Sequence, residues 1–163
     1  MQSTDKLLPV RGDDAAEILI NDHKVIKSLL ADLAEAKQQR KRANTLERLK
    51  AVLTIHNATE ENLVYPAIRK VAGKKMESDH LYHETAEADV LVFELDTMLQ
   101  EGDEEKFEAT ARKLQKAVLE HIDDEENKAF PSLQERAEPE QAESLTESVR
   151  KFRASLHFEP ATA

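Results

Sequence analysis

Residues 56–66 read His-Asn-Ala-Thr-Glu-Glu-Asn-Leu-Val-Tyr-Pro, and residues 121–131 read His-Ile-Asp-Asp-Glu-Glu-Asn-Lys-Ala-Phe-Pro. Both stretches fit the pattern His-x-x-x-Glu-Glu-Asn-x-x-aromatic-Pro, and the second begins 65 residues after the first. Agreement at five fixed positions and one aromatic position is hard to obtain by chance in a chain with 6 histidines. The chain is therefore predicted to contain two copies of one helical unit, and the repeated residues indicate a shared site.

The spacing within each copy places an imidazole and a carboxylate on one face of a helix. Residues four apart share a face, so His56 lies beside Glu60, and His121 lies beside Glu125. Apolar residues at helical spacing lead up to both histidines: Leu49, Val52 and Leu53 in the first copy, Leu114 and Val118 in the second. A carboxylate buried there is costly unless a metal or a cationic group meets its charge. The repeat therefore predicts a metal site.

Two further segments supply the other histidines of the predicted site. His23 lies in an apolar stripe, and His80 and His83 are three residues apart and share a helix face. The apolar residues after His83 have the same spacing as those after His23: Ala86, Val90 and Phe93 in one segment, Ile26, Leu30 and Leu33 in the other. This match makes His83 the predicted repeat partner of His23. It predicts that five histidines project from four helices into one core, with His157 outside the pattern.

The positions of glycine and proline divide the chain into helices. Only 3 Gly and 5 Pro occur in 163 residues, which is little turn chemistry for a β-rich protein. Periodicity predicts helices over about 15–40, 44–71, 77–100 and 103–130, and a fifth over about 139–156. Pro66 and Pro131 are expected to kink or end their helices. The expected fold is all-α: an antiparallel up-down-up-down four-helix bundle over about 14–133 with an additional C-terminal helix over about 139–157, in one domain spanning 1–163.

Composition excludes several classes of protein. The net charge of −10 argues against a nucleic-acid partner and against an anionic membrane surface, because both require clustered Lys and Arg. The absence of cysteine excludes disulfides, thiolate metal sites and a cysteine nucleophile. The N-terminal residues show no signal-peptide pattern and no stretch is apolar enough for a membrane span, so a cytoplasmic location is expected.

The predicted ligands favour iron. Five imidazoles and two carboxylates exceed what one tetrahedral zinc ion needs, and they suit two six-coordinate ions bridged by carboxylates. Residues 83–87 lack the second histidine of the zinc hydrolase motif His-Glu-x-x-His. We therefore expect two non-haem iron ions as the cofactor, ahead of manganese or zinc.

The chain resembles the hemerythrin family, and more closely its bacterial HHE branch, over about residues 14–133. The resemblance rests on Asp22-His23, on the two repeat copies and on the His80/His83 region. It implies a diiron centre in which Glu60 and Glu125 bridge the ions. It further implies that one iron is held by three histidines and the other by two, with an open position on the second iron where dioxygen binds. The two implied sets are His80, His83 and His121, and His23 and His56.

Departures from the family pattern leave some ligands open. The third helix of the family has His-x-x-x-His where this chain has His80-x-x-His83, so Asp79 or Glu84 can replace an imidazole. Oxygen-carrying hemerythrins place the last carboxylate five residues after its histidine. That position is Glu126 here, although the repeat favours its neighbour Glu125.

The two tyrosines and the C-terminal segment each allow two interpretations. Tyr65 and Tyr82 are expected to fill the core, with hydrogen bonding to the site as the alternative. The segment 139–156 is expected to pack on the bundle, with a dimer contact as the alternative, so the protein is a monomer or a homodimer.

The resemblance leaves three functions open. The first is binding of dioxygen, nitric oxide or peroxide at the iron pair for sensing, storage or detoxification. The second is a diiron oxidoreductase of the peroxidase or catalase type. The third is storage of iron or repair of damaged iron centres. The sequence does not separate them, because a fold does not fix a function.

Overall fold

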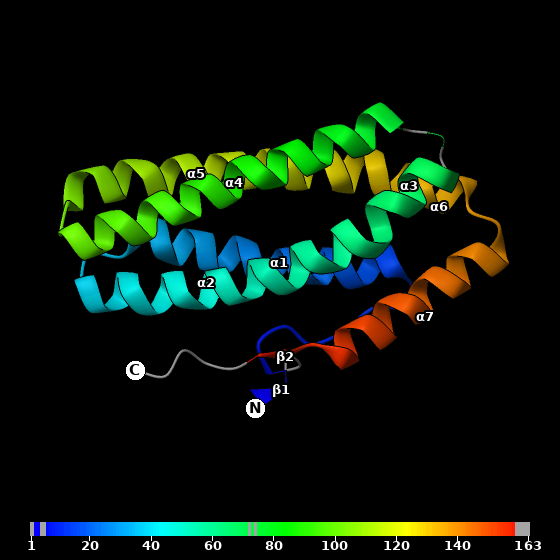
Figure 1. Ribbon diagram of the computed structural model, residues 1–163, viewed down its shortest axis with the longest axis horizontal. Helices are drawn as coiled ribbons and strands as arrows, with labels where there is room; N and C mark the ends of the chain where they lie inside the picture. The colour runs from blue at the N-terminus through cyan, green and yellow to red at the C-terminus, as the bar shows by residue number, and fades with distance from the viewer. Residues whose placement is uncertain (1, 4–5, 72, 74, 159–163) are drawn as a thin grey trace.

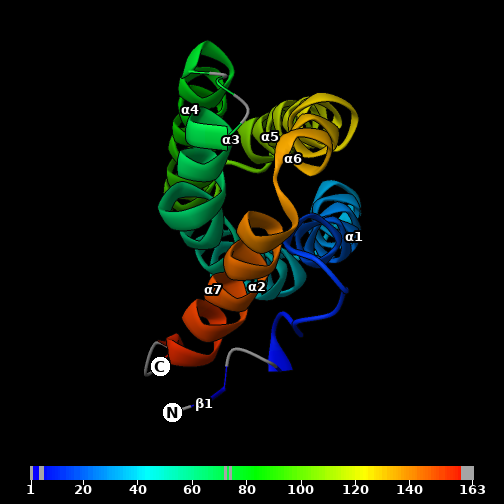
Figure 2. The ribbon, with the colours of Figure 1, turned by 90° about the vertical axis from the view of Figure 1, so that its right-hand side faces the viewer.

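Four long helices form an antiparallel bundle in the computed structural model, which describes residues 2–3, 6–71, 73 and 75–158 (Figure 1). They are α1 (Ala15–Glu35), α2 (Gln39–Thr59), α4 (Lys75–Glu101) and α5 (Glu104–Asp124). Each of them packs against two neighbours, in the order α1, α2, α4, α5 and back to α1 (Figure 2). The predicted all-α bundle is confirmed.

The turns between the helices follow from local capping chemistry. Asp14 and Asp103 cap α1 and α5, since each side chain accepts a hydrogen bond from the backbone three residues later, at 2.8 and 3.1 Å. Gly102 ends α4 with a φ of 74°, a left-handed conformation that favours glycine. Helix α1 ends at residue 35, earlier than predicted, and the side chain of Arg42 donates to the carbonyl of Ala36 just beyond that end.

A π-helical turn precedes each of the two prolines that the repeat places in its helices. Helix α2 continues through the π turn η2 (Glu60–Val64) into α3 (Tyr65–Val71). Helix α5 continues through η3 (Glu125–Ala129) into α6 (Phe130–Arg136). Proline cannot donate to the carbonyl four residues earlier, and a wider turn accommodates this loss without ending the helix.

These π turns change which residues share a face. The N–H of Tyr65 donates to the carbonyl of Glu60, and the N–H of Phe130 donates to that of Glu125, each five residues back. Residues five apart are thus brought together, and in the first copy the Tyr65 hydroxyl reaches the carboxylate of Glu60.

The core consists of two apolar clusters with polar residues between them. One cluster lies along the long helices and includes Leu30, Leu49 and Leu114. The other lies near α3 and α6 and includes Leu19 and Phe130. On α1, Leu19 belongs to the second cluster and Ile26 to the first. His23 therefore lies where one cluster ends and the other begins.

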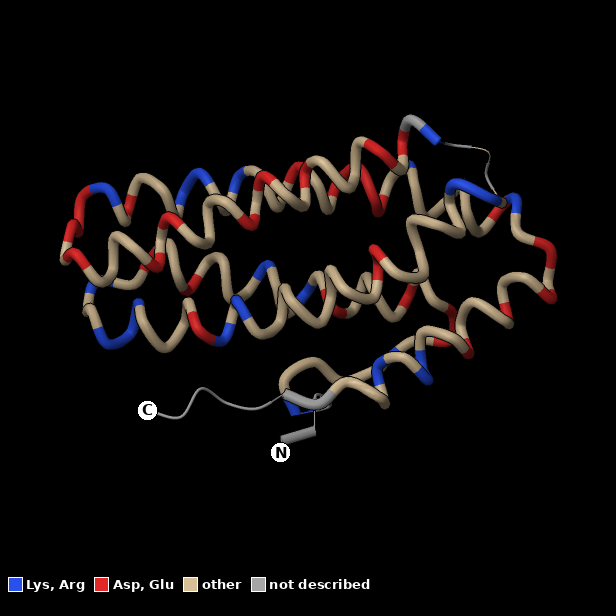
Figure 3. Tube along the Cα trace, in the orientation of Figure 1, with Lys and Arg blue, Asp and Glu red and all other residues tan. Residues whose placement is uncertain are grey.

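The last helix, α7 (Pro139–Ser155), packs on α1, α2 and η2, so the additional C-terminal helix is also confirmed (Figure 2). Beyond it, β2 (His157–Phe158) pairs antiparallel with β1 (Gln2–Ser3) in a two-stranded ribbon. Acidic residues are concentrated on α4, which carries no Lys or Arg after Lys75 (Figure 3). Among the described residues, no helix combines the length and the apolar character that a bilayer crossing requires.

Candidate metal centre

Four buried side chains converge at the middle of the bundle. His23 comes from α1, His56 from α2, and Glu60 and Glu125 from the two π turns. Each offers one ligand atom, and the four atoms all lie within 4.8 Å of one another. His23, Glu60 and Glu125 are fully buried, and His56 is 3% exposed. Four of the seven predicted ligands meet in this group, and a fifth, His121, lies 3.2 Å from Glu125 at its edge.

The first set of donor atoms is formed by the two imidazoles and one oxygen from each glutamate. His23 Nε2 lies 3.2 Å from Glu125 Oε2 and 4.0 Å from Glu60 Oε1. His56 Nε2 lies 3.1 Å from Glu60 Oε1. The spacing and the nitrogen and oxygen chemistry of this set suit a transition-metal cation.

A second set of donor atoms surrounds the hydroxyl of Tyr65. This hydroxyl donates to Glu125 Oε1 at 2.8 Å and lies 3.0 Å from Glu60 Oε2 and 3.1 Å from His121 Nε2. His121 Nε2 is also 3.2 Å from Glu125 Oε1. Glu60 and Glu125 therefore present one carboxylate oxygen to each set.

Unsatisfied atoms in the first set test whether a cation fits. Among the described residues, His23 Nε2, Glu60 Oε1 and Glu125 Oε2 are buried atoms without a hydrogen-bond partner. A buried polar group left in this way costs about 1–3 kcal/mol, and more when it is charged. Three such atoms converging on one point are explained by a cation that binds all of them. The residues present therefore fit a metal ion.

Each histidine of the cluster is held on its outer side by a carboxylate. His23 Nδ1 lies 2.8 Å from Glu126, His56 Nδ1 lies 3.2 Å from Asp22, and His121 Nδ1 lies 2.9 Å from Glu84. An N–H donated outward fixes the tautomer and leaves Nε2 available toward the centre. Sequence reasoning offered Glu126 as an alternative bridge, but the structure places it outside the histidine, with 26% of its side chain exposed.

The pKa values of His56, His121 and Glu125 are shifted by their buried neighbours. Burial lowers the pKa of His56, but the charge of Glu60 and the hydrogen bond to Asp22 outweigh burial and raise that pKa to about 10. Burial likewise lowers the pKa of His121, and its contacts with Glu125 raise it to about 9. Burial raises the pKa of Glu125, but His121 and His23 outweigh it and lower that pKa. Imidazole protons thus balance the carboxylates, and a metal would displace them.

His80 and His83 do not join this cluster. The His83 side chain is 69% exposed and pairs with Glu87, and the His80 side chain is 57% exposed and lies 3.1 Å from Glu84. The prediction that both project into the core is wrong. Thr85 takes the inward position, since it is buried and lies 3.5 Å from the Tyr65 hydroxyl.

The cause is the rotation of α4 about its axis. Its packed stripe runs through Leu81, Ala88 and Leu95, whereas Val90 and Phe93, predicted as core, are exposed. Phe93 has 72% of its surface exposed.

The two carboxylates of α4 that the sequence left as alternative ligands lie apart from each other. Glu84 contacts Nδ1 of His121, whereas Asp79 pairs with Arg69 and Lys75 at the surface.

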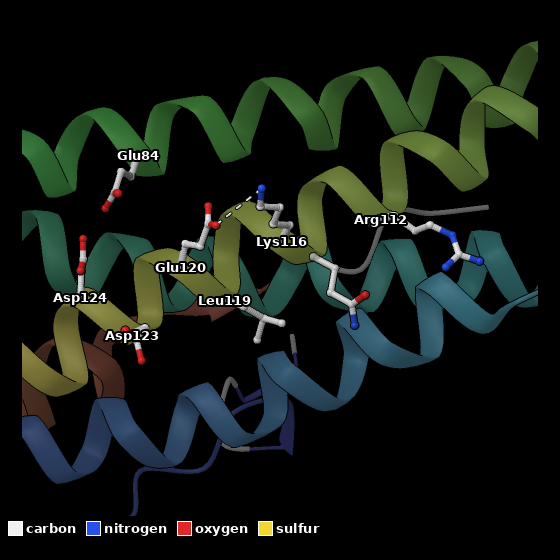
Figure 4. Close-up of a pocket in the computed structure, with 8 residues that line it drawn as sticks. Glu84, Arg112, Lys116, Leu119, Glu120, Asp123 and Asp124 are labelled. Carbon is white, nitrogen blue, oxygen red and sulfur yellow. Dashed lines mark ion pairs between the residues drawn. The ribbon is translucent and has the colours of Figure 1, made fainter.

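Two hollows lie near the centre. A cavity of about 20 Å³ lies beside His56 and His121, and its other walls include Leu53, Val118 and Ile122. A larger, solvent-open hollow of about 760 Å³ lies along α5, and Glu84 of α4 lines it at one end. Figure 4 shows Glu84 and Asp124 facing each other at one end of it. Glu84 connects this hollow to the second donor set, because it also contacts Nδ1 of His121.

Known proteins share both the sequence pattern and the fold. The family model described as Hemerythrin HHE cation binding domain matches residues 14–133. A crystal structure of a hemerythrin HHE cation binding domain-containing protein from Mycobacterium kansasii is 25% identical and has a TM-score of 0.73, covering 88% of this chain and 90% of that chain. A protein from Nostoc sp. named DNA nickase is 24% identical over 140 residues. That match covers 86% of this chain but only 39% of the relative's length.

Proposed function

The chain belongs to the hemerythrin HHE cation-binding domain family, and on that premise we propose that it holds two non-haem iron ions and binds dioxygen, nitric oxide or peroxide at them. The observation that carries this proposal is the division of the carboxylate oxygens. Glu60 and Glu125 each direct one oxygen toward His23 and His56 and the other toward His121 and Tyr65. Two donor sets that share both carboxylates suit a pair of bridged ions.

Tyr65 takes the place that the resemblance gave to the imidazoles of the third helix. Its counterpart in the repeat, Phe130, has no hydroxyl and stacks on His23, with ring centroids 5.9 Å apart. The second donor set therefore has the phenol of Tyr65 and no histidine from α4. Tyr65 would bind its iron as a phenolate, alongside His121 and the two shared carboxylates.

The surrounding residues suit a small ligand. Bound ferrous ions would supply electrons and an open coordination position. The cavity beside His56 and His121 is about the size of one small molecule, and its volume of about 20 Å³ excludes larger ligands. Thr85 and Asn57 also line this cavity, and their polar side chains can hydrogen-bond a ligand there.

An oxidoreductase of the peroxidase or catalase type is the second candidate, and one feature favours it. Glu84 and Glu126 contact the outer nitrogens of His121 and His23, and both carboxylates are partly exposed. They provide routes for protons between solvent and the centre, which repeated redox turnover requires and simple binding does not. Iron storage or repair remains the third reading.

The activity in the name of the Nostoc relative is not part of this proposal. The chain spans about two fifths of that protein's length. The net charge of the present chain is −10, whereas binding of a DNA backbone requires clustered Lys and Arg.

The test is to load the protein with ferrous iron without oxygen and to record optical spectra. Dioxygen, nitric oxide and hydrogen peroxide are then added separately. A binding protein gives a spectral change that persists for minutes and reverses when a gaseous ligand is removed. An oxidoreductase consumes peroxide in large excess over iron. The proposal is contradicted if none of the three ligands changes the spectrum of the wild type.

A further inference from the structure

A buried ion pair connects the last helix to the metal centre. Arg153 of α7 has a fully buried side chain, and its Nη1 donates to Asp22 Oδ2 at 2.7 Å. Its Nη2 lies 3.4 Å from the other oxygen of Asp22 and donates to the carbonyl of Leu8 at 2.8 Å. Asp22 Oδ2 also lies 3.2 Å from Nδ1 of His56. The contacts therefore run from α7 through α1 to a candidate ligand on α2.

Asp22 differs from the other two carboxylates that hold the histidines. Glu84 and Glu126 have side chains 19% and 26% exposed, so water meets part of their charge. Asp22 is fully buried, and a buried carboxylate is retained only when a cation and hydrogen bonds satisfy it. The planar fork of the Arg153 guanidinium reaches both oxygens and fixes the direction of the carboxylate.

We propose that Arg153 is a positioning residue for the metal centre, which holds Asp22 so that His56 keeps its Nδ1–H outward and its Nε2 toward the ion. This inference rests on the proposed metal site. It assigns a role to α7 that packing alone does not give. Arg153 and Leu8 both lie outside residues 14–133, the part that the family model matches. The segments flanking the matched domain are thus part of the construction of its centre.

Arg150 provides a matched control on the same helix. It is exposed, and its Nη2 donates to the carbonyl of Gly12 at 2.7 Å, so it too connects α7 to the N-terminal segment. It does not share the buried pair with Asp22. Replacing either Arg150 or Arg153 by methionine removes one guanidinium from α7. Only Arg153→Met removes the guanidinium that contacts Asp22, the partner of His56.

The experiment is a titration of metal-free protein with Co²⁺, followed by its visible absorbance, on wild type, Arg150→Met, Arg153→Met and Arg153→Lys. Circular dichroism establishes that each variant is folded. Loss of a group that orients a metal-binding histidine typically weakens metal binding about 10–100-fold, and we expect this for Arg153→Met. Arg150→Met should bind as wild type does. Arg153→Lys, which keeps a cation beside Asp22, should recover part of the loss.

Two further variants separate positioning from a general loosening of the fold. In a His56→Ala background, Arg153→Met should weaken residual Co²⁺ binding no further, because the residue that it positions is absent. An equal loss in both backgrounds overturns the inference. If Arg153→Met does not fold, Asp22→Asn, which is nearly the same size, takes its place, and wild-type affinity in that variant overturns the inference.

Failure of the inference differs from failure of the proposed function. Wild-type protein that binds no Co²⁺ overturns both. Wild-type protein that binds Co²⁺, with Arg153→Met and Arg150→Met binding equally well, overturns the role of Arg153 alone.

Discussion

Replacing Tyr65 by phenylalanine removes one hydroxyl from the second donor set. That hydroxyl is buried and donates to Glu125, and it is also the hydrogen-bonding contact of Glu60 Oε2. In the variant, Glu125 Oε1 keeps its contact with His121 at 3.2 Å, whereas Glu60 Oε2 loses the phenol. The change should therefore weaken both the metal-free protein and the iron-loaded centre.

The size of the effect follows from the charge of the acceptor. A hydrogen bond to a charged group contributes about 1.5–3 kcal/mol to stability. In a protein of this length each kcal/mol shifts the melting temperature by about 2–4 °C, so metal-free Tyr65→Phe should melt about 3–12 °C below wild type. In the iron-loaded protein, a phenolate bound to ferric iron gives a visible charge-transfer band, and the variant should lose it.

Tyr82 supplies the control. Its ring packs edge-on against that of Tyr65, with centroids 4.9 Å apart, but its hydroxyl donates to the backbone carbonyl of Glu61. Tyr82→Phe therefore removes a hydroxyl from the same region without touching the carboxylates. It should keep the visible band and lose less stability. A wild-type visible band in Tyr65→Phe, or the loss of that band in Tyr82→Phe, would refute the role given to Tyr65.

Three further predictions follow from the burial and charge of the centre. Metal-free protein should melt at a lower temperature at pH 10 than at pH 6.5: the pKa values of His56 and His121 are raised to about 10 and about 9, so their stabilising contribution is complete below about pH 6.5 and is lost as pH rises through those values. An equal or higher melting temperature at pH 10 would contradict this. His56→Ala should lose iron in elemental analysis while His83→Ala keeps it, since the first side chain is 3% exposed and the second is 69% exposed. Loss of iron in His83→Ala would show that α4 turns inward when metal binds. Removing the metal should lower the melting temperature by about 5–10 °C at a free metal concentration of about 100 Kd, since a ligand that binds only the folded state contributes about 2.7 kcal/mol there; identical melts with and without metal would exclude a buried shared site.

The sequence predicted the repeat well because the repeat depends on local spacing. His56 with Glu60 and His121 with Glu125 are four residues apart within apolar stripes, and the structure buries all four. The additional helix was predicted from Pro139 and the apolar spacing after it, and α7 begins at that proline. Helical period and proline placement were sufficient for these features.

The orientation of α4 was not predictable in the same way, because this helix carries two candidate apolar stripes. Ala86, Val90 and Phe93 match the spacing found after His23, whereas the stripe that packs is Leu81, Ala88 and Leu95. Which stripe faces inward depends on the neighbouring helices, and a single sequence does not contain that information directly.

Contacts across the chain account for the other omissions. The π turns bring Tyr65 onto the face of Glu60, a face that it does not share at the ordinary helical period. The pair of Asp22 and Arg153 joins residues 131 positions apart, and neither residue has a local pattern that announces the other.

The iron content of the purified protein tests the central claim most directly. Wild-type protein is loaded anaerobically with ferrous iron, freed of loosely bound metal by gel filtration and measured by elemental analysis against protein concentration. Two donor sets sharing Glu60 and Glu125 predict about two iron ions per chain, and Glu125→Ala should reduce that number. One tightly held ion per chain in the wild type, whether iron or zinc, would contradict the iron pair.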